Sequence, residues 1–177
     1  MLAVFPVVAQ LKEQQPQAHN KALKYCSDDN RKVMSKIIRE IESAGATALE
    51  SFIDGIKADP IKDSTMPRDG TVHQMASDAL LFLEQLLNYA DVGGGMIAGQ
   101  ANDGNSSAAQ SKRSFANFLV KALTAITTNL DAKAKYEDHA LRSLFLMNNY
   151  NFVFNRLKKY EPQLIMFDMN DKYLELN

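Results

Sequence analysis

The side chains best suited to metal binding or nucleophilic catalysis are widely scattered in this sequence of 177 residues. His19, His73 and His139 have no histidine, cysteine or carboxylate at metal-ligand spacing beside them, so a zinc site would require a coincidence of folding. Neither Cys26, the only cysteine, nor the serines have a nucleophile elbow or a partnered histidine. We expect no metal, no cofactor, no catalytic residue and no enzyme activity, and we expect each histidine at the surface or in a helix cap.

A glycine triplet, Gly93-Gly94-Gly95, offers bare backbone amides of the kind that bind phosphate. No Gly-Lys-Ser/Thr ending follows it and no strand pattern precedes it, as a phosphate loop requires. Because Gly95 and Gly99 are about one helical turn apart, we favour close helix packing or a fraying helix end over ligand binding. The acidic pairs Asp28-Asp29 and Glu137-Asp138 are expected to complement helix dipoles.

The cluster Asn148-Asn149-Tyr150-Asn151 interrupts a run of aromatic and aliphatic residues that repeats with helical spacing. Amides that become buried in such a helix must find hydrogen-bond partners. We expect Asn148, Asn151 or Asn155 to bond to a neighbouring helix or loop. This structural role is favoured over direct contact with a partner protein.

Basic side chains gather at two places, Lys133 with Lys135 and Arg156 with Lys158 and Lys159. They could meet anionic lipid, which would give salt-sensitive binding to liposomes. Cations at the end of a helix also complement its dipole, so solvated helix ends are the favoured interpretation.

The elements that must position these groups are helices, because apolar residues recur every three or four positions along most of the chain. Two shorter helices, 2–14 and 17–25, are expected on either side of Pro16. A long helix is expected over 31–57, ending before Asp59-Pro60. Its expected inner face contains Val33, Ile37, Ile41, Ala44, Ala48, Phe52 and Ile56.

A second long helix is predicted over 71–97, after a loop at 61–70, with Thr71 and Gln74 forming a capping box. The small polar residues at 100–107 predict a loop, the segment most suited to disorder. A third long helix is expected over 115–130. A fourth covers 141–156, with Asp138 as its N-cap and Leu141, Leu144, Phe145, Asn148, Phe152, Asn155 and Arg156 following the helical period.

No segment alternates with a period of two for long enough to predict a strand. The fold class is therefore all-α, with successive antiparallel helices stacked in bundles. The length of the 31–57 helix, on the order of 40 Å, favours an elongated rod. We divide the chain into 1–70, part of one bundle, and 71–177, part of the next bundle and continuous with the first.

The charges nearly cancel, with 20 basic and 21 acidic residues, so charge does not predict a nucleic-acid partner. The apolar start lacks the positive charge of a signal peptide, and Pro6 interrupts it. No run approaches the roughly 18 apolar residues of a membrane-spanning helix. We expect a cytoplasmic protein, in keeping with the single cysteine.

Three segments, in this order, resemble the seventy-kilodalton subunit family of the exocyst, a vesicle-tethering complex. They are Pro67-Arg68-Asp69-Gly70-Thr71-Val72-His73, Leu80-Leu81-Phe82-Leu83-Glu84-Gln85-Leu86-Leu87 and Leu144-Phe145-Leu146-Met147-Asn148-Asn149-Tyr150. Shorter matches are Phe5-Pro6-Val7, Gly45-Ala46, Ala48-Leu49-Glu50 with Phe52, Lys112-Arg113, Tyr136-Glu137-Asp138 and Ala140-Leu141. The chain departs from the family pattern at Met147, where histidine is usual, and in its glycine triplet.

The resemblance implies a central fragment of a longer helical rod and a non-catalytic role in docking secretory vesicles at the plasma membrane. It implies other exocyst subunits and Rho-type GTPases as partners, with peripheral recruitment from the cytoplasm to sites of secretion. Family binding to phosphatidylinositol 4,5-bisphosphate is attributed to a C-terminal region absent here. The alternative is a helical binding module for a Rho-type GTPase or a partner helix, which a solvent-facing patch of several hundred Å² formed by Phe115, Phe118 or Phe154 would favour.

Overall fold

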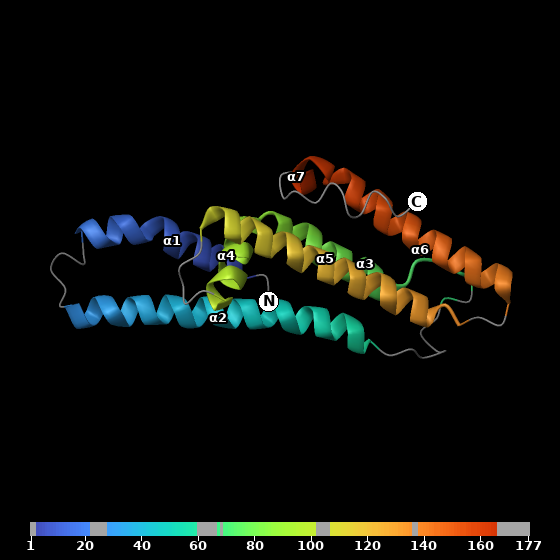
Figure 1. Ribbon diagram of the computed structural model, residues 1–177, viewed down its shortest axis with the longest axis horizontal. Helices are drawn as coiled ribbons and strands as arrows, with labels where there is room; N and C mark the ends of the chain where they lie inside the picture. The colour runs from blue at the N-terminus through green and yellow to red at the C-terminus, as the bar shows by residue number, and fades with distance from the viewer. Residues whose placement is uncertain are drawn as a thin grey trace. The chain divides into compact units, whose positions relative to one another are not determined.

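The computed structural model describes residues 3–21, 28–59, 67, 69–101, 107–135 and 138–165. This part is almost entirely α-helical and contains no strand (Figure 1), which confirms the all-α class. Its helices are α1 (Val4–Lys21), α2 (Asp28–Ala58), α3 (Gln74–Leu87), α4 (Ala90–Ala101), α5 (Ala108–Lys133), α6 (His139–Lys159) and α7 (Glu161–Ile165). None of these helices is both long enough and apolar enough to cross a membrane.

The chain forms two compact units, and each unit joins segments that are far apart in the sequence. The first comprises Met1–Glu50 and Asn88–Phe115, and the second comprises Ser51–Leu87 and Ala116–Asn177. The rod shape and the division at residue 70 stay predictions.

In the first unit, α1 runs antiparallel to the first part of α2 (Figure 1), and Lys12 Nζ lies 2.7 Å from Glu42 Oε1. The core of this unit is formed by large apolar residues from all its helices. They are Phe5, Val8, Ile38, Leu49, Met96 and Phe115.

Glycine makes the close contact between α4 and the start of α5 possible. A Cβ added to Gly94 would lie 2.2 Å from the carbonyl oxygen of Ser111, closer than any real contact. This confirms the packing role expected for the glycine triplet. The spacing in the sequence pointed to Gly95 and Gly99, whereas the residue against the α5 backbone is Gly94.

In the second unit, the end of α2 packs with α3, most of α5 and α6. Its core contains Ile53, Ile56, Leu80, Leu83, Leu86, Leu119, Leu123, Ile126, Leu130, Phe145 and Val153. The face predicted for the third long helix is confirmed, since Phe115, Phe118, Leu119, Ala122, Leu123, Ile126 and Leu130 are all buried in α5.

The expected inner faces of two other helices are partly wrong, by a rotation of one residue. In α2, Val33 and Ile37 are 55% and 45% exposed, while Ile38 and Leu49 are buried. In α6, the buried side chains are Phe145, Asn149 and Val153, while Leu144 and Asn155 are exposed. Both helices carry apolar residues on adjacent stripes, so the period alone fits either stripe and the packing partners select one.

The expected break at Pro16 is wrong, because α1 continues through it to Lys21. A proline inside a helix removes one backbone hydrogen bond but already has a helical φ, so the surrounding helix can retain it at a cost. Residues 22–25 of the expected second helix lie outside the described residues.

The expected helix over 71–97 is in fact two helices, since α3 ends at Leu87 and α4 begins at Ala90 after a turn at 88–89. The expected capping box of Thr71 and Gln74 is also wrong, because α3 begins only at Gln74. A capping box occurs at α5 instead: Ser107 N–H donates to Gln110 Oε1 (2.8 Å), and Gln110 N–H donates to Ser107 Oγ (3.2 Å). Residues 100–101 of the predicted loop belong to α4 instead, and residues 102–106 lie outside the described part.

Candidate functional site

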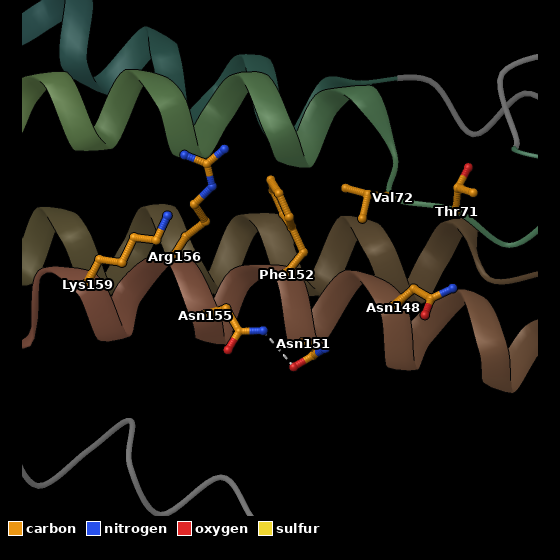
Figure 2. Close-up of a pocket in the computed structure, with 8 residues that line it drawn as sticks. All are labelled: Thr71, Val72, Asn148, Asn151, Phe152, Asn155, Arg156 and Lys159. Atoms are coloured by element: carbon orange, nitrogen blue, oxygen red, sulfur yellow. Dashed lines mark hydrogen bonds between the residues drawn. The ribbon is translucent and has the colours of Figure 1, made fainter.

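Within the second unit, an extended segment formed by residues 69–73 lies against α6 and leads into α3 (Figure 2). Its second residue, Gly70, is buried and has a φ of 69°, a conformation that favours glycine. A Cβ at Gly70 would lie 3.3 Å from the side chains of Leu141 and Leu144 and from Phe145 N. Both the backbone conformation and the tight space against α6 therefore favour glycine at this position.

Amide side chains of α6 hold the segment in place. Asn148 Nδ2 donates to Gly70 O (2.9 Å). Asn149 is fully buried, and its Oδ1 accepts from His73 N–H (2.9 Å) while its Nδ2 donates to Thr71 O (3.3 Å) and Phe145 O (2.8 Å). Asn149 thus uses both its donor and its acceptor to fix the segment on the helix.

These contacts confirm the structural role expected for the amide cluster and for Asn148. Of the three asparagines named as alternatives, Asn148 bonds to another element, whereas Asn151 and Asn155 are exposed and bond to each other along α6. The sequence interpretation missed Asn149. The available signal was its spacing, four residues from both Phe145 and Val153, which are the two buried apolar residues of the helix.

His73 connects the segment to α3 as its N-cap. Its Nδ1 accepts from Met75 N–H (3.1 Å), and its carbonyl oxygen accepts from Ser77 N–H (3.2 Å). The cap expected for this histidine is confirmed, but a surface position is wrong because the residue is only 5% exposed. Among the other histidines, His139 is exposed at the start of α6, and the side chain of His19, like Cys26, lies outside the described part.

Asp69 organises the start of the segment. Its Oδ1 accepts from Thr71 Oγ1 (2.9 Å) and Thr71 N–H (3.3 Å). These bonds stabilise the ionised carboxylate, with the hydroxyl contributing most, so the pKa of Asp69 is lowered from 3.8.

Replacing Asp69 with asparagine is expected to weaken the dependence of stability on pH in acid. Because the folded-state pKa is lowered, the carboxylate adds stability above its ordinary value of 3.8, and this is lost as the pH falls through the folded value. Asp69→Asn keeps an acceptor oxygen but does not titrate. Urea unfolding between neutral and acidic pH measures the slope, and Thr71→Val should weaken it in the same direction. An unchanged slope in both variants would contradict the argument.

Beside the segment lies an open groove of about 380 Å³ on α6, the amide groove. Its lining residues are Thr71, Val72, Asn148, Asn151, Phe152, Asn155, Arg156 and Lys159. Phe152 and Arg156 point toward α3 (Figure 2), where Arg156 Nη1 lies 3.1 Å from both carboxylate oxygens of Glu84. The Arg156 guanidinium also lies 5.2 Å from the centre of the Phe152 ring. The ion pair between Arg156 and Glu84 therefore places the guanidinium beside Phe152, an apolar residue of the groove lining.

The basic residues divide between buried and exposed positions. Lys133 is buried and lies 2.7 Å from Asp59 Oδ2, so the solvated helix end expected for it is wrong. Lys135, Lys158 and Lys159 are exposed, as expected for solvated positions.

Tyr150 and Asp131 tie α6 to α5. The Tyr150 hydroxyl donates to Asp131 Oδ1 over 2.5 Å. Partial burial and this carboxylate raise the pKa of Tyr150, because both disfavour the phenolate.

The described ranges contain no group of three or more histidine, cysteine, aspartate or glutamate side chains arranged to hold a metal. Asp138 caps α6 as predicted, with its Oδ1 accepting from Ala140 N–H (2.8 Å). The side chains of Asp28 and Asp29 and residue 137 are outside the described part.

Three phenylalanines were expected to distinguish a scaffold from a binding module. Phe115 and Phe118 are buried, and Phe154 is 46% exposed.

Comparison with known proteins identifies the family. The model for the C-terminal part of the Exo70 exocyst complex subunit matches residues 1–175. Human exocyst complex component 7 is 39% identical over 165 residues, 91% of this chain and 22% of that protein. Its Drosophila melanogaster counterpart is 26% identical over 145 residues, 73% of this chain and 21% of that protein. Arabidopsis thaliana exocyst complex component EXO70A1 is 30% identical over 128 residues, 69% of this chain and 19% of that protein.

The chain spans about a fifth of the length of these relatives. Two motifs within that span carried the resemblance, the one at 67–73 and the twin asparagines at 148–149. The amide hydrogen bonds of α6 join these two motifs. The matches to the family model and to the human protein confirm the resemblance inferred from the sequence. The chain belongs to the Exo70 family of exocyst proteins.

Proposed function

We propose that this chain serves in the exocyst as a non-catalytic helical spacer that helps to dock secretory vesicles at the plasma membrane. The observation that carries the proposal is the family match along nearly the whole chain. A spacer must keep its ends at a fixed separation, so its helices must not slide past one another. Within the first unit the close packing at Gly94, and within the second unit the buried Asn149 bonds, support this proposal.

The partners in this proposal are other exocyst subunits, with Rho-type GTPases as regulators. The protein is cytoplasmic and is recruited peripherally to the plasma membrane at sites of secretion. Contact with phosphoinositide is assigned to a region of the family outside this chain. The burial of Phe115 and Phe118 favours the spacer over a binding module whose docking face would include them.

The proposal is tested by replacing the matching segment of human exocyst complex component 7 with residues 1–175 of this chain. In cells depleted of the human protein, we expect the chimera to co-precipitate with the other exocyst subunits and to restore delivery of a secretory cargo to the cell surface. The same chimera carrying Gly94→Leu should lose cargo delivery, whereas Gly55→Ala should retain it. Normal delivery by the Gly94→Leu chimera would contradict a rigid spacer.

A second measurement addresses direct lipid binding. We expect this chain not to sediment with vesicles containing phosphatidylinositol 4,5-bisphosphate at either low or high salt. Salt-sensitive sedimentation that is lost in Lys158→Glu and Lys159→Glu would move the membrane contact onto this chain.

A further inference from the structure

The amide groove contains a hydrogen-bonding pair that the fold does not use. Asn155 Nδ2 donates to Asn151 Oδ1 (2.9 Å), the bond drawn as a dashed line in Figure 2. Within the described part of the chain, this leaves the amide nitrogen of Asn151 as a free donor and the amide oxygen of Asn155 as a free acceptor. A peptide backbone offers the complementary pair, a carbonyl oxygen and an N–H group.

The spacing of these two amides suits an extended chain. Residues four apart on a helix are separated by about 6 Å along its axis. In an extended peptide, groups on the same side repeat every two residues, which is about 6.6 Å. Asn151 and Asn155 can therefore bond to successive backbone groups on one side of such a peptide, and the bond between the two asparagines restricts the motion of both side chains.

The groove is positively charged at one end. Its lining includes Arg156 and Lys159 and no carboxylate. Arg156 is already bonded to Glu84, whereas Lys159 makes no ion pair among the described residues and is exposed one turn beyond Asn155. Lys159 is thus placed to receive an acidic side chain from a peptide bonded to the asparagines. Val72 and Phe152 provide the apolar surface beside it.

We propose that the amide groove binds an extended, acidic peptide segment of a partner protein. Asn151 and Asn155 bond to its backbone, and Lys159 pairs with an aspartate or glutamate side chain. This inference does not depend on the exocyst role, because it rests only on the groove.

The test measures binding of a fluorescein-labelled decapeptide of alternating alanine and aspartate to the 177-residue chain, by fluorescence anisotropy. A second peptide has the same sequence with alternate backbone nitrogens methylated, and a third replaces aspartate with asparagine. We expect the first peptide to bind and the other two to bind more weakly by on the order of tenfold.

Variants of the protein locate the contact. Lys159→Glu and the double variant Asn151→Ala with Asn155→Ala should each weaken binding on the order of tenfold. The matched control is Lys158→Glu, which makes the same charge change at the adjacent exposed residue outside the groove. Its affinity should stay within about twofold of the parent. Circular dichroism verifies that all variants remain folded.

Three results would overturn the inference. They are no binding of the acidic decapeptide, equal binding of the methylated peptide, and equal losses in Lys158→Glu and Lys159→Glu with none in the asparagine double variant. In a parallel arm with phosphatidylserine vesicles, binding that depends on the lysines but not on the asparagines, without peptide binding, would assign the groove to lipid headgroups instead. Failure of the chimera to restore secretion leaves these measurements unaffected.

Discussion

Replacing Gly94 with alanine is expected to destabilise the protein by about 2–3 kcal/mol. The added Cβ would lie 2.2 Å from Ser111 O and 2.8 Å from Ser111 C. Both are backbone atoms of α5, so no side-chain rotation can relieve the overlap, and the two helices must separate. Alanine has a better helix propensity by about 1 kcal/mol, which offsets only part of the loss.

Two other glycines provide controls for this substitution. A Cβ at Gly55 in α2 would have no heavy atom within 4 Å, and a Cβ at Gly95 would approach only the flexible end of Lys12, at 3.4 Å, and the Ser111 hydroxyl, at 3.9 Å. Gly55→Ala and Gly95→Ala should therefore leave stability unchanged or raise it by up to about 1 kcal/mol. Urea unfolding followed by circular dichroism compares the three variants. If Gly94→Ala matched Gly95→Ala, the close contact between α4 and α5 would be refuted.

The sequence predicted the buried face of a helix correctly where the apolar pattern fits only one face. Helix α5 has one apolar stripe, and its buried residues, including Phe115 and Leu130, were predicted correctly. Helix α2 has apolar neighbours such as Ile37 and Ile38, so two stripes fit the same period. Which stripe is buried depends on tertiary partners that the period does not contain.

Helix starts were harder to predict because several side chains can cap a helix. Ser107 and Gln110 satisfy the capping-box rule at the start of α5, but we applied this rule only to Thr71 and Gln74. At α3 the same rule pointed to Thr71 and Gln74. There the N-cap is His73, which was expected at the surface or in a helix cap, and its imidazole accepts from Met75 N–H.

The candidate site was only partly predictable for a related reason. The sequence indicated that the asparagines near residue 150 would have a structural role, but all of them lie within about two turns of one helix. The acceptors and donors that distinguish them, Gly70 O, Thr71 O and His73 N, are 76 to 78 residues away in the chain. Only the fold brings them to Asn148 and Asn149.

Replacing Asn149 with alanine is expected to destabilise the protein by about 3–4 kcal/mol. The change removes three hydrogen bonds. The N–H of His73 and the carbonyl oxygen of Thr71 then lose the side chain that takes the place of water as their hydrogen-bond partner. Of the three amide bonds between the 69–73 segment and α6, only the one from Asn148 to Gly70 O remains. Asn151→Ala, on the exposed part of the same cluster, should change stability by less than about 0.5 kcal/mol.

Comparing Asn149→Asp with Asn149→Ala distinguishes the effect of losing hydrogen bonds from the effect of losing side-chain volume. Aspartate has nearly the same shape, and its carboxylate can still accept from His73 N–H, but at neutral pH it places a negative charge against the carbonyl oxygens of Thr71 and Phe145. Protonation restores a donor, so this variant should regain stability relative to the parent as the pH falls, whereas Asn149→Ala should not. Urea unfolding at neutral and acidic pH distinguishes the two. If the loss in Asn149→Asp did not change with pH, the donated hydrogen bonds could not account for the stability supplied by Asn149.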